Sequence, residues 1–97
     1  MKTIDEIRKI VQKYAHENDI KSVRLFGSYA DGKANQSSDV DLLVEYNKTP
    51  SLMNFLGLQE VLQDELNTKV DLIEYPIDKK RLFYKDFKIN KEILIYG

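Results

Sequence analysis

The spacing of hydrophobic residues changes several times along the chain, and each change predicts a different element. From Ile4 to Ala15, apolar residues recur every three or four positions, which predicts an amphipathic helix. Thr3 and Glu6 have the spacing of a capping box, in which each side chain binds the other residue's backbone N–H at the start of a helix. We expect this helix to end near Asn18.

Four short apolar segments have the composition of β-strands, and one longer segment has the spacing of a second helix. The expected strands cover residues 22–26, 39–46, 69–75 and 93–96. The second helix is expected to have Thr49 as its cap and Pro50 in its first position. Its predicted core face consists of Leu52, Phe55, Leu56, Leu62 and Leu66. A short helical turn and a polar loop are expected over residues 29–37, and a further helical stretch over 78–90.

This order of elements predicts an α+β (or α/β) domain, in which a small mixed β-sheet has its helices packed on one face. The uncovered face of the sheet would then be available for a functional site. The connections are short, and no repeat or linker interrupts the pattern. We therefore expect residues 1–97 to form a single domain, which is a sufficient length for one hydrophobic core.

The composition narrows the chemistry that the chain can support. It contains no cysteine and a single histidine, which excludes disulfides, thiolate metal sites and His-rich zinc sites. A metal would need oxygen ligands, as Mg²⁺, Mn²⁺ and Ca²⁺ prefer. No apolar stretch approaches the roughly 20 residues that span a bilayer, and no signal peptide is recognisable. We therefore expect a cytoplasmic protein without membrane contact.

The charge is unevenly distributed along the chain. Residues 1–75 carry nine Lys/Arg against thirteen Asp/Glu, whereas residues 76–97 carry six against three. The net charge of −1 is not that of an autonomous nucleic-acid-binding domain, so we expect no direct nucleic-acid binding. The basic tail is interpreted as a solvated helical face, with contact to an acidic partner or to nucleotide phosphates as the alternative.

Two acidic residues mark the start of the second expected strand. Asp39 and Asp41 are two positions apart, so on a strand they share one face at a separation of about 6.5 Å. Val40, between them, points to the opposite face with Leu42 and Val44. Two neighbouring carboxylates repel each other, and a divalent ion between them removes this repulsion. The alternative is an ordinary solvated acidic turn.

Two other segments support a functional interpretation. Gly27 and Ser28 follow an apolar strand, where a close backbone approach and free amides would hold phosphate oxygens. Asp71 is an acid within the expected strand 69–75, a position that disfavours aspartate unless it has a partner. Taken separately, Gly27-Ser28 is a common turn pair and Asp71 could be an exposed edge-strand residue.

If the strand of Asp71 lies beside the strand of Asp39 and Asp41, the three carboxylates converge. Together with a phosphate-binding turn, they are then what two-metal phosphoryl transfer requires. Asp39 and Asp41 would bridge the two ions. Asp71 would bind the ion near the acceptor oxygen and help to remove its proton. The predicted catalytic and metal-binding residues are therefore Asp39, Asp41 and Asp71, and the predicted nucleotide-binding residues are Gly27 and Ser28.

The combined motif resembles the signature of the DNA polymerase β-like nucleotidyltransferase superfamily. It consists of Gly27-Ser28 and, after a polar loop, the run from Ser38 to Val44. The short chain and the strand around Asp71 make it similar to the minimal nucleotidyltransferase family. This resemblance implies a polymerase β-like fold, ATP as substrate, and two Mg²⁺ ions for which Mn²⁺ could substitute. One departure is Asp31, which stands where many relatives have a basic residue.

The resemblance also implies a partner. Minimal members are often paired with an all-helical HEPN-domain toxin, and the nucleotidyltransferase acts as the antitoxin by transferring AMP to a tyrosine of that toxin. A hetero-oligomer with a HEPN-type protein is therefore expected. The alternative is a catalytically weak antitoxin that neutralises its partner by binding and masking alone. A transferase acting on an aminoglycoside or another small molecule is disfavoured, because the chain has no room for an acceptor-binding domain.

Overall fold

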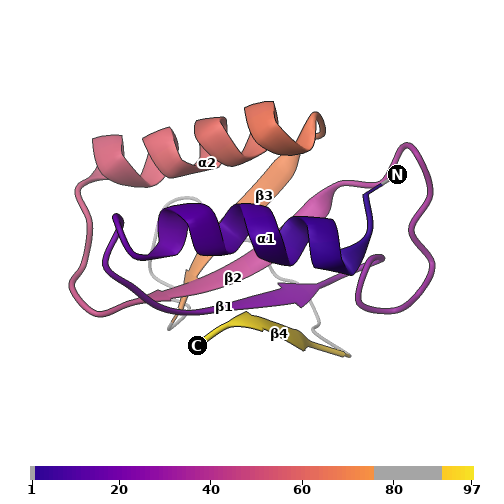
Figure 1. Ribbon diagram of the computed structural model, residues 1–97, viewed down its shortest axis with the longest axis horizontal. Helices are drawn as coiled ribbons and strands as arrows, with labels where there is room; N and C mark the ends of the chain where they lie inside the picture. Colours follow the sequence, from indigo (N-terminus) through magenta and orange to yellow (C-terminus); the bar gives the residue numbers. More distant parts are fainter. Residues whose placement is uncertain (1, 76–90) are drawn as a thin grey trace, which may run out of the picture.

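The computed structural model describes residues 2–75 and 91–97, and within them a four-stranded sheet carries two helices (Figure 1). The elements in chain order are α1 (Ile4–Ala15), β1 (Ile20–Phe26), β2 (Val40–Tyr46), α2 (Leu52–Leu66), β3 (Val70–Tyr75) and β4 (Ile93–Tyr96). The strand order is β3-β2-β1-β4. β1 is antiparallel to both β2 and β4, whereas β2 and β3 are parallel. The predicted mixed sheet of an α+β fold is confirmed.

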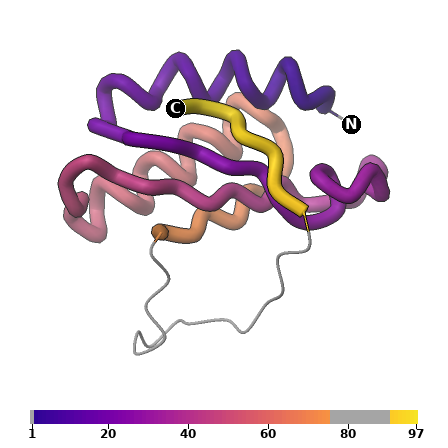
Figure 2. The backbone as a smooth tube through the Cα atoms, turned by 90° about the horizontal axis from the view of Figure 1, so that it is seen from below, coloured from indigo at the N-terminus to yellow at the C-terminus, as the bar shows by residue number. Residues whose placement is uncertain are grey.

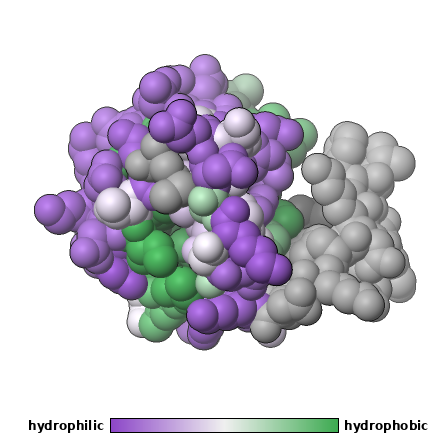
Figure 3. Space-filling model, turned by 90° about the vertical axis from the view of Figure 1, so that its right-hand side faces the viewer, coloured by the Kyte–Doolittle hydropathy of each residue, from purple (hydrophilic) through white to green (hydrophobic). Residues whose placement is uncertain are grey.

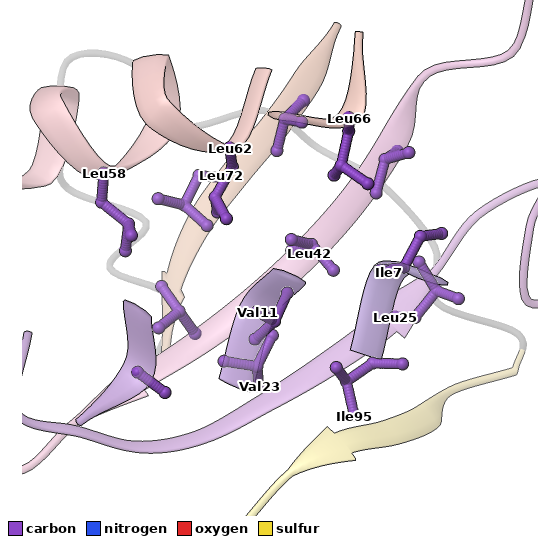
Figure 4. Close-up of a cluster of buried hydrophobic side chains, with 14 of the residues drawn as sticks. Ile7, Val11, Val23, Leu25, Leu42, Leu58, Leu62, Leu66, Leu72 and Ile95 are labelled. Atoms are coloured by element: carbon purple, nitrogen blue, oxygen red, sulfur yellow. The ribbon is translucent and has the colours of Figure 1, made fainter. Parts of the chain in front are cut away.

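Both helices pack on the same face of the sheet and share one core with it (Figure 4). α1 contributes Ile7, Val11 and Ala15, and α2 contributes Leu58, Leu62 and Leu66. The strands supply the opposing side chains, which include Val23, Leu25, Val40, Leu42, Val44, Val70, Leu72 and Ile95. Their alternation along each strand follows the two-residue period of extended chain. The opposite face of the sheet carries no helix among the described residues.

α1 begins as predicted but ends earlier. The Thr3 hydroxyl accepts from the Glu6 N–H at 3.1 Å, and Glu6 Oε1 accepts from the Thr3 N–H at 3.3 Å. These bonds lower the pKa of the Glu6 carboxyl. The helix ends at Ala15 rather than near Asn18. Asn18 Nδ2 instead donates to the Tyr14 carbonyl at 2.8 Å, and Asp19 turns the chain in the left-handed region at φ +53°.

α2 corrects two predictions. Its N-cap is Ser51, whose hydroxyl accepts from the Asn54 N–H at 3.1 Å, and not Thr49. Pro50 therefore precedes the cap and does not occupy the first position of the helix. Leu52 and Leu56 were expected in the core, but they are 71% and 50% exposed. Leu58, which the predicted face omitted, is buried. Each residue advances a helix by about 100°, so the face centred on Leu58, Leu62 and Leu66 leaves Leu52 and Leu56 on its flank.

The other boundaries differ by one or two residues. β1 begins at Ile20, β2 at Val40 and β3 at Val70, whereas β4 spans 93–96 as predicted. The short helical turn and polar loop expected over residues 29–37 are observed as a turn over residues 27–32, followed by residues 33–39 outside any helix or strand. The helical stretch predicted for 78–90 lies outside the described residues. Neither described helix is long and apolar enough to cross a membrane.

The C-terminal strand lies at one edge of the sheet. β4 runs beside β1, as both Figure 1 and Figure 2 show. α1 is tied to this strand by Arg8, whose Nη2 donates to the Leu94 carbonyl at 3.3 Å. The opposite edge is formed by β3. The two central strands, β1 and β2, therefore have a sheet neighbour on each side.

Candidate functional site

Three strands meet at one end of the sheet, where the predicted site residues lie. β1 ends at Phe26, and Phe26 pairs with Asp41 near the start of β2. Asp41 also pairs with Asp71 on the parallel strand β3. Since paired residues on neighbouring strands are direct neighbours in the sheet, Asp41 and Asp71 lie side by side. Gly27, the next residue after Phe26, is at the same end.

Asp39 lies just outside β2, one residue before the strand that was predicted to contain it. Its place is nevertheless fixed, because the next residue, Val40, is completely buried and donates its N–H to the Lys69 carbonyl at 2.9 Å. The side chain of Asp39 is 40% exposed, and that of Asp71 is 29% exposed. The buried Val40 thus separates Asp39 from Asp41, and both of these aspartates are half-buried.

The loop that leads into Asp39 is held by its own polar side chains. Asn35 donates its N–H to the Ser38 hydroxyl at 2.9 Å, and its side-chain oxygen accepts from the Ser37 N–H at 2.8 Å. Thr68, just before β3, donates its hydroxyl to the Ser38 carbonyl at 3.4 Å. These bonds join the start of β2 to the start of β3 and so bring Asp39 toward Asp71.

Gly27 is required by the geometry of the turn after β1. Its φ of +73° lies in the left-handed region, which side chains disfavour. A Cβ at this position would overlap Oδ2 of Asp41 outright. The backbone of Gly27 therefore lies directly against one of the predicted metal-binding carboxylates.

Ser28 lies in a single turn and does not begin a helix. The Asp31 N–H donates to the Gly27 carbonyl at 3.0 Å, and the Lys33 N–H donates to the Ser28 carbonyl at 2.9 Å. Tyr29 and Ala30 are buried and anchor the turn. The predicted helix N-terminus for phosphate binding is therefore wrong. The backbone bonds of this turn use the amides of Asp31 and Lys33 as donors, and phosphate binding by the amides that precede them stays a prediction.

Lys69 belongs to the site, although the sequence interpretation gave it no role. Its Nζ lies 3.8 Å from Asp39 Oδ2 and 4.0 Å from Asp71 Oδ1. The side chain is 62% exposed, so each ion pair is solvated and weak. A sequence signal for it existed: Lys69 is two positions before Asp71, the same spacing that places Asp39 and Asp41 on one face.

The carboxylate oxygens of the site suit a divalent cation, but their side chains are not arranged as a complete set of metal ligands. Within residues 2–75 and 91–97, no group of three Asp, Glu, His or Cys side chains is arranged to hold a metal ion. The Lys69 ammonium, however, is a cation that two of the predicted ligands already share. All available ligands are oxygens, the type that Mg²⁺ and Mn²⁺ prefer. The donor chemistry of these carboxylates therefore fits such an ion.

The surface on this side of the molecule is mainly hydrophilic, with a smaller hydrophobic patch within it (Figure 3). The helix-free face of the sheet also has a shallow polar hollow. It is lined by Ser22, Arg24, Leu43, Glu45, Tyr75 and Glu92. Leu43 and Glu45 follow Asp41 on β2 at two-residue spacing, so the hollow lies on the same face of the sheet as the Asp41 side chain.

Comparison with known proteins defines the family. Residues 6–97 match the family model described as polymerase beta, nucleotidyltransferase. The chain belongs to this family. Its resemblance to minimal nucleotidyltransferases is thereby confirmed, and the chain is a nucleotidyltransferase.

Relatives in archaea share much of this chain's sequence. The chain is 43% identical over 77 residues to the protein MJ1215 of Methanocaldococcus jannaschii, with 75% of this chain and 90% of that protein covered. It is 38% identical over 79 residues to the protein adenylyltransferase MntA of Thermococcus cleftensis, with 75% and 78% covered.

A solved structure supports the same fold. A chain of a toxin–antitoxin complex with AMP-PNP superposes with a TM-score of 0.73 at 21% identity. The match covers 93% of this chain and 73% of that one. At this identity the likeness shows the fold alone.

Proposed function

We propose that this chain transfers AMP from ATP to a protein acceptor and acts as the antitoxin of a HEPN-type toxin, with a tyrosine of the toxin as acceptor. The proposal rests mainly on one observation. Asp41 and Asp71 are paired in register on parallel strands, and the Gly27 turn lies against Asp41. A phosphate-binding backbone and two metal-binding carboxylates then meet at one point, as nucleotidyl transfer requires.

Each residue has a defined task in this proposal. Asp39, Asp41 and Asp71 hold two Mg²⁺ ions, or Mn²⁺ in their place. When bound, the ions supply positive charge to the attacking and leaving oxygens. The backbone at Gly27 and Ser28, with the Ser28 hydroxyl, orients the phosphates through N–H and O–H donors. Gly27 has no side chain, which lets the nucleotide approach Asp41 closely.

The transfer step is a displacement at the α-phosphorus of ATP. The tyrosine oxygen of the acceptor forms the new P–O bond, and the bond from the α-phosphorus to the bridging oxygen breaks, which releases pyrophosphate. Asp71 accepts the tyrosine proton as the general base. Asp71 is suited to this because its side chain is partly exposed on an edge strand, where an acceptor can reach it.

The protein acceptor is supported by the nature of the relatives. One is named a protein adenylyltransferase. A structural neighbour, at 20% identity and a TM-score of 0.69, is a chain of the complex between a tri-AMPylated HEPN toxin of Shewanella oneidensis and an MNT antitoxin. These names describe those proteins, and we extend them to this chain as a proposal.

The test is a transfer reaction that uses the full chain, a co-encoded HEPN-type protein, Mg²⁺ and each of the four NTPs. Intact mass spectrometry would measure the AMP units added to either protein. We expect addition to the HEPN protein from ATP, and its complete loss in an Asp39→Asn/Asp41→Asn variant. Asp64→Asn, the same kind of substitution at an exposed position on α2, is the control for loss of a carboxylate away from the site and should transfer normally.

Toxin neutralisation separates transfer from masking. If Asp39→Asn/Asp41→Asn still binds and neutralises the toxin as well as the unmodified chain does, the masking antitoxin is correct and the enzymatic proposal is wrong. If neutralisation and AMP addition are lost together while the complex still forms, the transferase is supported.

A further inference from the structure

Lys69 places a positive charge between two predicted metal ligands that come from different strands. Its Nζ is 3.8 Å from Asp39 Oδ2, next to β2, and 4.0 Å from Asp71 Oδ1 on β3. Lys69 is the one described lysine or arginine whose ion pairs bridge two predicted ligands. Each ion pair is weak by itself, so an effect of Lys69 depends on its contact with both carboxylates at once.

The main chain fixes where this lysine lies. The Lys69 carbonyl accepts from the Val40 N–H at 2.9 Å, and the preceding Thr68 hydroxyl donates to the Ser38 carbonyl at 3.4 Å. Val40 and Val70 are both completely buried, so the backbone on either side of the site is held by the core. The Lys69 side chain consequently starts beside both aspartates, whatever rotamer it adopts.

The electrostatic effect follows from this placement. Asp39, Asp41 and Asp71 carry like charges at one end of the sheet, and their mutual repulsion opposes convergence. A nearby ammonium reduces this repulsion. A divalent ion seeks the same oxygens and carries twice the charge, so the ammonium and the ion compete for one location.

We propose that Lys69 is a positioning residue: its ammonium is a tethered counter-cation that holds Asp39 and Asp71 together until a divalent ion displaces it. This inference rests on the proposed metal site. Lys69 stabilises the metal-free site and at the same time weakens metal binding. The protein thereby keeps its ligands close to one another without a bound ion.

The test is Mn²⁺ binding to the full chain, measured by calorimetry and by the shift of the thermal unfolding midpoint. In Lys69→Gln, we expect Mn²⁺ to bind about three- to tenfold more tightly, because the positive charge that competes for the same carboxylate oxygens is gone. The midpoint without metal should fall, and the increase on adding Mn²⁺ should grow. Lys69→Arg, which keeps the charge, should restore the affinity of the unmodified chain.

Lys48→Gln is the matched control, because Lys48 is an exposed lysine in the turn after β2. If Lys69→Gln binds Mn²⁺ like Lys48→Gln, or more weakly than the unmodified chain, the inference is overturned while the metal site stands. If the unmodified chain does not bind Mn²⁺, or if Asp39→Asn leaves the binding unchanged, the metal-dependent mechanism is wrong. The proposed role of Lys69 is then wrong as well.

Discussion

At the scale of single residues, two glycines in the turn after β1 differ in how much room a side chain would have. Gly27 and Gly32 have nearly the same left-handed backbone, at φ +73° and +74°. A Cβ at Gly32 would meet nothing within 4 Å, whereas one at Gly27 would overlap the Asp41 carboxylate. A side chain at Gly32 would therefore add backbone strain alone, whereas a side chain at Gly27 would also displace the Asp41 carboxylate.

Replacement of these glycines by alanine should have unequal effects. Both variants place a side chain in the left-handed region, at a cost of about 1–2 kcal/mol. Gly27→Ala should lose further stability and its Mn²⁺ binding, because Asp41 must move. Gly32→Ala should keep the binding. Urea unfolding and calorimetry would measure both, and equal loss in the two variants would contradict the role of Gly27 at the site.

Tyr46, the last residue of β2, has a buried hydroxyl without a hydrogen-bond partner among the described residues. Its ring lies against Phe55 of α2, with 6.5 Å between ring centroids. Burial raises the pKa of this phenol to about 12, and the nearby negative charge of Glu74 adds to the rise. The unfolded phenol has a pKa of about 10.

This difference predicts a loss of stability at alkaline pH. Between about pH 10 and pH 12 the unfolded chain gives up the Tyr46 proton while the folded chain keeps it, so stability falls as the pH rises. Tyr46→Phe should remove this part of the loss and should be no less stable at pH 7, since it deletes an unsatisfied group. Denaturant unfolding at several pH values would measure the difference, with the exposed Tyr75→Phe as control. Parallel alkaline losses in Tyr46→Phe and the unmodified chain would refute the assignment.

At the scale of elements, α2 holds the exposed edge of β3 in place. Val70, the first residue of β3, donates its N–H to Gln63 Oε1 at 3.1 Å and accepts from Gln59 Nε2 at 2.7 Å. Edge strands have backbone groups that no strand pairs, and here two glutamines of one helix satisfy them. The contact also sets the position of the neighbouring Asp71.

Removal of this contact should destabilise the fold. Gln63→Ala strands the N–H of the buried Val70, which we expect to cost about 1–3 kcal/mol. Gln63→Glu keeps an acceptor and should recover most of that loss. Gln12→Ala, at an exposed position of α1, gains the same helix propensity and controls for it. Urea unfolding would measure the stability of all three variants. If Gln63→Ala is as stable as Gln12→Ala, α2 does not support β3 through this contact.

At the scale of the whole molecule, the sheet order creates the candidate site. β2 and β3 are separated in sequence by all of α2, yet they are parallel neighbours, and this crossover brings Asp71 to Asp41. β4 pairs with the other side of β1 and forms the sheet edge opposite to β3. The sequence predicted each strand and each acid. The prediction that the three carboxylates converge required β2 and β3 to be neighbours, and the structure confirms that they are.

Some features could not be predicted because several arrangements satisfy the same local pattern. The leucines of α2 occupy more than one side of the helix, and only packing against the sheet decides that Leu58 is buried and Leu56 exposed. The turn after Gly27 has residues compatible with a helix, but the buried Tyr29 and Ala30 hold it to one turn.

By itself, the sequence determined what depends on neighbouring residues. The capping box at Thr3 and Glu6, the inward direction of Val40 and Leu42, and the outward direction of Asp41 all follow from spacing within a few positions. Only the tertiary structure decided which distant residues meet. Asp41 lies beside Asp71, and Lys69 lies between Asp39 and Asp71, because the packing of two helices on one sheet selects a single strand order. That selection depends on the burial of the whole core, which no local pattern encodes.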